Sequence, residues 1–323
     1  MKRPAPLSIG DKVAIIAPSS PLPDENIDRA IDSIRFIGLE PVVFPSCTSI
    51  HGYFAGKDDV RAKDLNDAFA DRSIKGIFCL RGGYGSTRIL NKIDFDLIKA
   101  NPKIFVGYSD ITSLHTAITQ RCGFMTFHAP MPNTRYRNFD EYTLNYFKSN
   151  LFSDKPLGEV FNPEGEEIKT IVSGVCEGQI TGGNLCLIHN TLSSPYEINT
   201  KGKILLIEEI AEMPYRLDRV FNALALAGKF EDCAGIILGT FTDCEAPEAG
   251  NPLEALSVVS GGSLTLLEIF DEVIAPFNKP TIFNLRIGHV YPQLSLPLGA
   301  FARLDATNGR LVLLDNFVEH KGA

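Results

Sequence analysis

The sequence contains no tryptophan, no long hydrophobic run and no paired metal-ligand motif. Its apolar segments fall short of the roughly 18 uninterrupted residues that span a membrane, and its first residues contain no apolar core of a signal peptide. We therefore expect a cytoplasmic protein without a membrane partner. The 323 residues, of which 44% are hydrophobic and 22% charged, are enough for about two globular domains.

The chain also has fewer positively charged than negatively charged side chains. The chain has 31 lysines and arginines against 39 acidic residues, which gives a formal net charge of −8. A protein that binds nucleic acid needs positive charge to neutralise the phosphates. We therefore expect no nucleic-acid partner.

Cysteine and histidine occur without the spacings that hold metals. The seven cysteines are odd in number and form no C-x-x-C pair, and the six histidines form no H-E-x-x-H motif. We interpret the cysteines as small, mostly buried side chains of a protein in a reducing compartment. The sequence predicts neither a structural metal nor a cofactor.

The first half of the chain alternates short apolar runs with amphipathic stretches, which predicts parallel strands connected by helices. Each predicted strand leads into a turn rich in glycine, serine or proline, and open α/β sheets place their ligand sites at such turns. The predicted strands cover residues 13–17, 41–44, 74–80 and 104–106, and the predicted helices cover 25–37 and 58–70.

The apolar pattern thins between residues 153 and 170, where we place a linker between an N-terminal domain (1–152) and a C-terminal domain (171–323). The C-terminal domain is predicted to have a mixed α+β fold. Its expected strands lie near residues 178–181, 204–207 and 236–238, with helices at about 215–227 and 263–274 and short β segments at 294–296, 300–304 and 311–314.

Ser109 is the first candidate for chemistry. It follows the apolar strand 104–106 and Gly107, and it stands at the start of a predicted helix. A nucleophile on a sharp strand-to-helix turn projects from the backbone, and amides at the helix N-terminus can face a developing oxyanion. The segment lacks the last glycine of the hydrolase motif G-x-S-x-G. Alternatively, Ser109 or Asp110 only caps the helix.

A glycine-rich turn at residues 81–85 follows the predicted strand 74–80. Its three glycines let the backbone approach a ligand closely, either to hold a phosphate or to donate to an oxyanion. The residues that define a phosphate loop or a dinucleotide-binding loop are missing. A tight turn with only a structural role is the alternative.

Three carboxylates and one histidine complete the set of candidates. Glu208, Glu209 and Glu212 come at the end of an apolar strand, where one of them could orient an imidazole. Alternatively, they are solvated or cap the next helix. His289 lies in a predicted loop after Gly288, and an isolated histidine in a loop is usually a surface residue.

Six ordered segments, which include these candidates, carry a resemblance to a known family. They are GDKVAIIAPSS (10–20), RGGYG (81–85), GYSD (107–110), TGGNL (181–185), IEE (207–209) with EMPYRLDR (212–219), and GH (288–289) with LPLG (296–299). Together they resemble the LD-carboxypeptidase family, serine peptidases that include muramoyl-tetrapeptide carboxypeptidases and microcin C self-immunity proteins. The similarity extends from about residue 10 to 315.

The resemblance implies an α/β fold with a flavodoxin-like, parallel-sheet N-terminal domain and a C-terminal domain that contains a small β-barrel. It also implies a triad assembled between the domains, with Ser109 as the nucleophile, Glu208 as the acid and His289 as the base. The backbone N–H groups of Gly83 and Asp110 would form the oxyanion hole. Members of the family are metal-independent and typically dimeric, so a homodimer is implied as well.

The activity implied by the resemblance is removal of the terminal D-alanine from cytoplasmic murein tetrapeptides, in the recycling of cell-wall peptide. Arg81, beside the glycine turn, is a candidate for binding the substrate carboxylate; alternatively, it is a surface arginine paired with an acid. The immunity-type enzymes cleave nucleotide conjugates and commonly stack the base on a tryptophan. The lack of tryptophan favours the cell-wall peptide, although a tyrosine or phenylalanine could stack the base instead. A flavodoxin-like binding module without catalytic activity is the remaining alternative.

Overall fold

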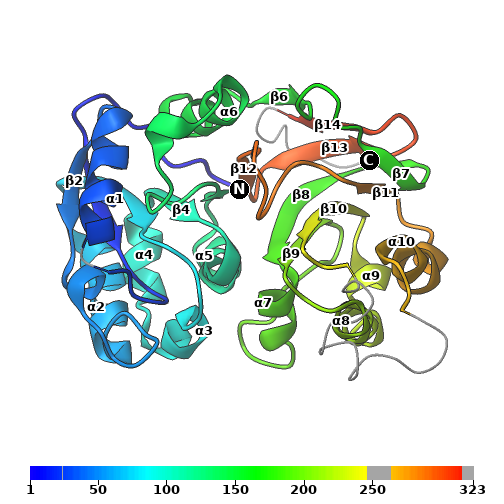
Figure 1. Ribbon diagram of the computed structural model, residues 1–323, viewed down its shortest axis with the longest axis horizontal. Helices are drawn as coiled ribbons and strands as arrows, with labels where there is room; N and C mark the ends of the chain where they lie inside the picture. Colours follow the sequence, from blue (N-terminus) through cyan, green and yellow to red (C-terminus); the bar gives the residue numbers. More distant parts are fainter. Residues whose placement is uncertain (24, 246–262, 315–323) are drawn as a thin grey trace, which may run out of the picture.

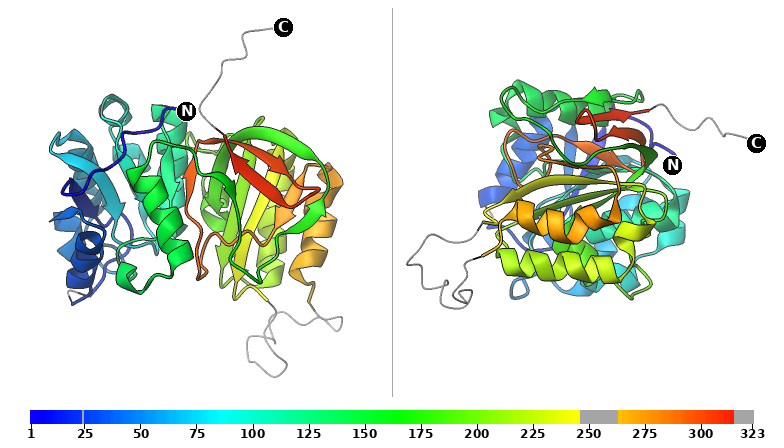
Figure 2. Two further views of the ribbon diagram at one scale, coloured as in Figure 1. Left: turned by 90° about the horizontal axis from the view of Figure 1, so that it is seen from above. Right: turned by 90° about the vertical axis from the view of Figure 1, so that its right-hand side faces the viewer.

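The computed structural model describes residues 1–23, 25–245 and 263–314 and contains two β-sheets. The first sheet and its helices come mainly from the first half of the chain, and the second sheet comes from the second half (Figure 1). The two halves lie side by side (Figure 2). The change from the first sheet to the second therefore falls near the middle of the chain, apart from β12 (Leu296–Leu298), which belongs to the first sheet.

The first sheet has six strands in the order β12-β5-β4-β3-β1-β2. Strands β1 to β5 are parallel, and their order 2-1-3-4-5 confirms the flavodoxin-like sheet. β12 extends this sheet, antiparallel to β5. The six strands are β1 (Lys12–Ile16), β2 (Glu40–Val43), β3 (Ile74–Cys79), β4 (Ile104–Gly107), β5 (Thr126–His128) and β12 (Leu296–Leu298).

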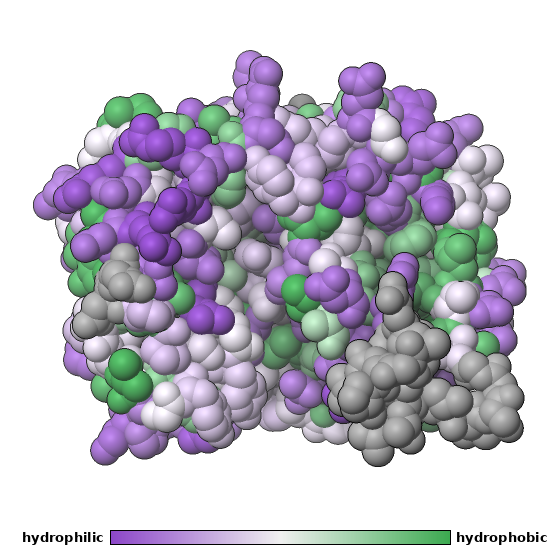
Figure 3. Space-filling model, viewed as in Figure 1, coloured by the Kyte–Doolittle hydropathy of each residue, from purple (hydrophilic) through white to green (hydrophobic). Residues whose placement is uncertain are grey.

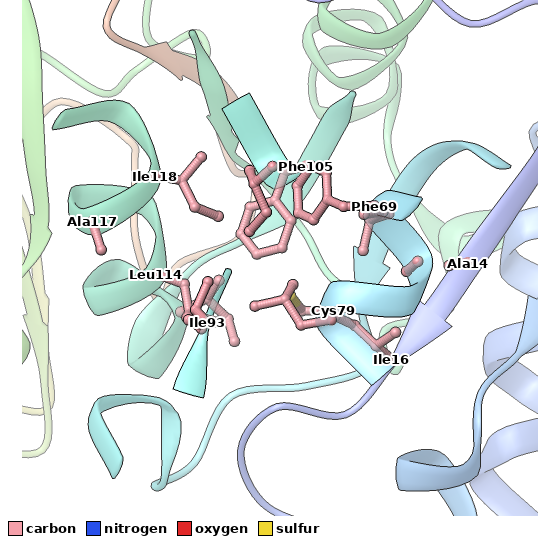
Figure 4. Close-up of a cluster of buried hydrophobic side chains, with 14 of the residues drawn as sticks. Ala14, Ile16, Phe69, Cys79, Ile93, Phe105, Leu114, Ala117 and Ile118 are labelled. Atoms are coloured by element: carbon pink, nitrogen blue, oxygen red, sulfur yellow. The ribbon is translucent and has the colours of Figure 1, made fainter. Parts of the chain in front are cut away.

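Helices cover both faces of the first sheet, so its central strands are fully buried. Neighbouring residues of β1 point to opposite faces. Ala14 and Ile16 pack in the core shown in Figure 4, which includes residues of α2, α4 and α5, whereas Val13 and Ile15 pack with α1 and α6. This two-sided burial explains the continuous apolar runs in the sequence. The helices are α1 (Glu25–Phe36), α2 (Asp58–Ala70), α3 (Ser86–Ile89), α4 (Phe95–Ala100), α5 (Thr112–Cys122) and α6 (Glu141–Phe152).

The second sheet has eight strands in the order β6-β14-β13-β8-β9-β10-β11-β7. Strands β8 to β11 are parallel, and the other four pair antiparallel with their neighbours. The strands are β6 (Gly158–Val160), β7 (Lys169–Val172), β8 (Val175–Asn184), β9 (Ile204–Ile210), β10 (Gly235–Thr242), β11 (Thr281–Phe283), β13 (Phe301–Asp305) and β14 (Arg310–Leu313).

Helices cover one face of the second sheet. On the other face, side chains from several strands of the sheet pack against one another. Leu205 and Ile207 of β9 pack against the helices, whereas Leu206 packs in a separate core with Ile282 of β11 and Leu311 of β14. The strand pairings of the described residues leave the sheet open between β6 and β7, so the implied barrel is not confirmed. The helices are α7 (Leu185–Asn190), α8 (Pro214–Leu226), α9 (Lys229–Asp232) and α10 (Leu266–Ile269).

The structure differs from the sequence prediction at two places in the second half. The predicted linker 153–170 contains β6 and the start of β7, which are short, partly exposed strands and therefore show little apolar pattern. The helix predicted at 263–274 begins at Leu266, after a capping box formed by Thr265 and Glu268, and continues as a π-helical turn. The division of the chain into two domains stays a prediction.

Within the residues that the structure describes, no helix is both long enough and apolar enough to cross a bilayer.

Candidate active site

The carboxyl ends of three neighbouring strands meet at one edge of the first sheet. β1 leads into Ser19 and Ser20, β3 leads into the glycine-rich turn at residues 81–85, and β4 leads into Ser109. The strand order reverses between β1 and β3, and open α/β sheets bind their ligands where the order reverses. The surface is hollowed between the two halves of the molecule in the view of Figure 3.

Ser109 lies on a sharp turn between β4 and α5. Its φ angle is +63°, a left-handed conformation that is uncommon for residues other than glycine. It opens a short 3₁₀ turn, η3 (Ser109–Ile111), which continues into α5. Gly107 permits this turn, because a Cβ atom there would lie 2.9 Å from the Ile111 side chain. A serine held in this conformation between a buried strand and a helix has the arrangement of a nucleophile elbow.

Asp110 connects three loops next to Ser109 and does not cap the helix that follows. Neither η3 nor α5 has a side-chain cap. Instead, Oδ2 of Asp110 accepts a hydrogen bond from Ser19 Oγ at 2.5 Å and one from the amide of Ser86, the first residue of α3, at 2.8 Å. Burial raises the pKa of the Asp110 carboxyl, and the bonds from Ser19 and Ser86 limit this rise.

The glycine-rich turn packs directly against Ser109. A Cβ atom on Gly82 would lie 2.9 Å from Ser109 Cβ and 3.5 Å from the amide nitrogen of Asp110. Gly83 has a φ angle of +109°, and a Cβ atom there would overlap with the side chain of Ser20. Only glycine allows the turn to come this close. The structure therefore brings Gly82 against Ser109, while Gly83 packs against Ser20 in the loop after β1.

Arg61 of α2 supports the glycine turn, and sequence reasoning did not identify it. Its guanidinium is fully buried, donates to the carbonyl oxygens of Pro18 at 2.5 Å and Gly85 at 2.8 Å, and pairs with Asp58. It thereby joins the loop after β1 to the turn after β3. The available signal was its position four residues before the buried Leu65, which places a charged residue on the apolar face of the helix.

The buried Glu208 of β9 and the partly buried His289 form a pair in the second half of the molecule. The Nδ1 atom of His289 donates to Oε2 of Glu208 at 2.8 Å, and the Glu208 side chain is fully buried. Burial favours the neutral imidazole, but the hydrogen bond and charge of Glu208, with the charge of Glu209, outweigh it and raise the pKa of His289. The pair has the geometry in which a carboxylate fixes the orientation of an imidazole.

Tyr108 links this pair to the Ser109 turn. The centroids of the Tyr108 and His289 rings lie 4.9 Å apart, with the rings tilted by 55°, and the fully buried His128 lies 5.7 Å from Tyr108. Burial raises the pKa of the Tyr108 phenol to about 12, and the charge of Glu208 adds to this rise. The contact places the His289 imidazole beside the residue that directly precedes Ser109.

Glu209 has different partners from Glu208. Its Oε1 accepts from Nδ2 of Asn184 at 2.7 Å, and its Oε2 accepts from the amide of Cys186 at 2.9 Å. Because successive strand residues point to opposite faces, only one member of the acidic pair can meet the imidazole. Glu209 instead anchors the start of α7 to β9.

The other two candidate residues lie outside the Glu208–His289 pair. Arg81 is half-buried at the start of the glycine turn, where its guanidinium makes a 3.4 Å hydrogen bond to the carbonyl of Pro21. Glu212 pairs with Arg216 of α8 at 3.6 Å. The described part of the chain brings together no group of three or more histidine, cysteine or acidic side chains that could hold a metal ion.

We predict that Gly288→Ala destabilises the protein by about 1–3 kcal/mol. Gly288 has a φ angle of +112°. A Cβ atom there would lie 2.6 Å from Oε2 of Glu208, the oxygen that accepts the hydrogen bond from His289. The control is Gly202→Ala, because Gly202 also has a positive φ but has open space around it. Denaturant unfolding of both variants measures the difference. Equal stability losses would contradict close packing at Gly288.

Both halves of the chain match models of one protein family. Residues 13–129 match the model of the LD-carboxypeptidase N-terminal domain, and residues 177–304 match that of the LD-carboxypeptidase C-terminal domain. A probable murein peptide carboxypeptidase of Bacillus subtilis is 38% identical over 312 residues, which cover 96% of this chain and 94% of that protein.

Two solved structures have the same fold. The muramoyltetrapeptide carboxypeptidase from Oxalobacter formigenes has a TM-score of 0.77 and 27% identity, covering 94% of this chain and 97% of that one. MccF in complex with glutamyl sulfamoyl guanosine has a TM-score of 0.86 and 22% identity, covering 99% and 100%. Because the two family models together match most of the chain, and the Bacillus subtilis relative is 38% identical over 96% of it, this protein belongs to the LD-carboxypeptidase family.

Proposed function

We propose that this protein is a serine LD-carboxypeptidase that removes the terminal D-alanine from murein tetrapeptides. Ser109 acts as the nucleophile, His289 as the general base and Glu208 as the residue that orients His289. The observation that carries the proposal is the hydrogen-bonded Glu208–His289 pair, whose imidazole packs against Tyr108, the residue directly before Ser109. The name of the Bacillus subtilis relative supports the choice of a murein peptide.

In this mechanism, Ser109 Oγ attacks the carbonyl carbon of the third residue of the tetrapeptide while His289 accepts the hydroxyl proton. The C–N bond then breaks, the leaving amine of D-alanine takes that proton from His289, and the tripeptide stays on Ser109 as an ester. Water attacks the ester with His289 again as the base, which releases the tripeptide and regenerates Ser109.

The oxyanion of each tetrahedral intermediate requires hydrogen-bond donors. We assign this role to the backbone N–H groups of Gly83 and Asp110, since the glycine turn and the first turn of η3 both pack around Ser109. The buried Arg61 and the Asp110 carboxylate hold these two segments in place. A single donor of this kind contributes about 10²–10³-fold to turnover.

Arg81 is our candidate for binding the terminal carboxylate of the substrate. It forms no ion pair with an acidic side chain in the described residues, and it lies at the start of the turn that packs against Ser109. Its charge is therefore available to a carboxylate. A site built around one terminal carboxylate should bind a pentapeptide poorly, because the extra residue would leave the cation unpaired.

The activity is expected to depend on the protonation of His289. Because Glu208 raises the pKa of His289, the acid limb of kcat/KM should have its midpoint above the ordinary histidine value of about 6.5. Below that midpoint, the imidazole is protonated and cannot accept the serine proton. The pH dependence of tetrapeptide hydrolysis measures this midpoint, and a midpoint clearly below 6.5 would contradict a raised pKa of the catalytic base.

The alternative substrate is an aminoacyl nucleotide conjugate, which is supported by the likeness to MccF in complex with glutamyl sulfamoyl guanosine. To decide between the two, kcat/KM is compared for a tetrapeptide, a pentapeptide and an aminoacyl sulfamoyl adenylate. We expect the tetrapeptide to be cleaved fastest, with release of D-alanine. Faster cleavage of the adenylate would favour the immunity-type activity, and the absence of cleavage of any of the three would favour a binding module.

We place this reaction in the cytoplasm, in recycling of cell-wall peptide. The seven cysteines are free thiols, and five of them are buried, which suits a reducing compartment. The homodimer implied by the family resemblance stays a prediction.

A further inference from the structure

Two exposed tyrosines lie beside the glycine turn and have no role in the chemistry described so far. Tyr53 is 65% exposed and Tyr84 is 45% exposed, and their ring centroids lie 6.1 Å apart. Exposed aromatic side chains that gather at one place commonly mark a binding surface. Tyr84 belongs to the glycine turn itself, two residues after Gly82, which packs against Ser109.

The rings of Tyr53 and Tyr84 both pack against the side chain of Phe54. Phe54 is buried and contacts both rings, with centroid distances of 4.4 Å to Tyr53 and 5.5 Å to Tyr84. The guanidinium groups of Arg61 and Arg88 each lie 4.8 Å from the centre of the Phe54 ring. The two exposed rings are therefore held in place before any ligand arrives, which lowers the entropic cost of binding.

The backbone around the tyrosines is fixed in the same way. The amide of Tyr84 donates to Ser20 Oγ at 3.1 Å, and the amide of Ala55 donates to the carbonyl of Ser19 at 2.9 Å. Both loops are thereby tied to the segment that follows β1, at the edge of the sheet where Ser109 lies. The tyrosine pair is thus continuous with the candidate active site.

Two charged side chains beside the tyrosines, Arg88 and Asp58, neutralise each other. Arg88 makes a two-point ion pair with Asp58, with its Nε 3.2 Å from each carboxylate oxygen and its second nitrogen 2.9 Å from one of them. The two rings offer apolar faces and hydroxyl groups beside the paired Arg88, and the charge of Arg81, at the start of the same turn, is assigned to the terminal carboxylate of the substrate. This chemistry suits the C–H face and hydroxyls of a pyranose ring better than a phosphate or a carboxylate.

We propose that Tyr53 and Tyr84 form a binding surface for the sugar of a muramoyl peptide. This inference rests on the proposed function and extends it from the peptide to the muramoyl group, after which the Oxalobacter formigenes carboxypeptidase is named. Three residues separate the scissile carbonyl of a tetrapeptide from the sugar, a span of up to about 10 Å. The Cα atom of Tyr84 lies within about 7 Å of that of Gly82, and its side chain extends farther.

The test compares kcat/KM for a muramoyl tetrapeptide with kcat/KM for the free tetrapeptide. We expect wild-type enzyme to prefer the muramoyl form, and we expect Tyr53→Ala and Tyr84→Ala each to lower the ratio of the two values by about 3- to 10-fold. Tyr84→Phe retains the ring and should keep most of the preference. The control is Phe161→Ala, which removes an exposed aromatic side chain from the second half of the molecule and should leave the ratio unchanged.

The possible outcomes separate this inference from the proposed function. If wild-type enzyme cleaves both substrates with equal kcat/KM, or if the tyrosine variants lose activity equally on both, the tyrosines do not bind the sugar and the inference is wrong. The inference is also wrong if the variants change only the oligomeric state, since the surface would then contact a second copy of the chain. If wild-type enzyme cleaves neither substrate, the proposed function itself fails.

Discussion

Replacing Ser109 by alanine is expected to lower kcat for tetrapeptide hydrolysis by about 10⁴- to 10⁶-fold. The proposed reaction passes through an ester on Ser109 Oγ, and alanine has no oxygen that could form it. The backbone turn should persist, because Gly107 and Gly82 still permit the close packing of the elbow. Residual activity would come from the oxyanion donors and from substrate binding alone.

Ser193→Ala is the matched control. Ser193 also has a left-handed backbone, with a φ angle of +60°, and it is exposed in a loop after α7. Both variants therefore place alanine in the same unfavourable conformation and lose one hydroxyl. Similar unfolding curves with a loss of turnover only in Ser109→Ala would assign the loss to chemistry. Hydrolysis of the tetrapeptide by Ser109→Ala at the wild-type rate would contradict the serine mechanism.

Glu208→Gln is expected to lower kcat by up to about 10⁴-fold, whereas Glu209→Gln should affect mainly stability. The amide of glutamine cannot stabilise the charged imidazole, and its NH₂ group can favour the wrong tautomer of His289. Glu209 accepts hydrogen bonds from Asn184 and from the amide of Cys186. An NH₂ group facing one of these donors costs about 1–3 kcal/mol.

Tetrapeptide turnover and denaturant unfolding are measured for both variants. Each variant is the control for the other, because the two substitutions are chemically identical and lie at adjacent positions. The expected pattern is a large loss of kcat in one variant and a loss of stability in the other. A larger loss of kcat in Glu209→Gln than in Glu208→Gln would reverse the assignment of the two residues.

The strands that position the nucleophile could be predicted from the sequence because their local signal is strong. β4 (Ile104–Gly107), and β3 (Ile74–Cys79) apart from the exposed Lys75, are buried on both faces, so they appear as apolar runs that end at glycine or at a glycine-rich turn. The same reasoning identified the turn at Ser109, because a strand, a glycine and a helix follow one another within a few residues. These features depend only on neighbouring positions.

Features that depend on distant positions could not be predicted. β12 (Leu296–Leu298) pairs with β5 (Thr126–His128), and neither three-residue strand has a pattern that indicates its partner. The choice between Glu208 and Glu209 depends on which face β9 (Ile204–Ile210) turns toward the imidazole, and tertiary packing sets that orientation. Here the family resemblance, and not the local pattern, selected Glu208.

The supporting residues were missed for a similar reason. Tyr108 lies within the GYSD segment, but its contact with His289 joins two halves of the molecule that are far apart in the chain. Arg61 could have been noticed as a charge on an apolar helix face, yet its partners Pro18 and Gly85 lie in two other loops. Gly82 packs against Ser109, and this contact too joins segments far apart in the chain; the role of its neighbour Gly83, which the family resemblance implies, stays a prediction.

The central claim is that Ser109 is the nucleophile and that His289 activates it. Labelling of the active site tests this claim most directly. The enzyme is treated with a fluorophosphonate, which phosphonylates activated serines, and the modified residue is located by mass spectrometry. We expect one label on Ser109, loss of tetrapeptide hydrolysis in step with labelling, slower labelling in the presence of tetrapeptide, and none in His289→Ala. Full activity after complete modification of Ser109, or inactivation through a label on another residue, would contradict it.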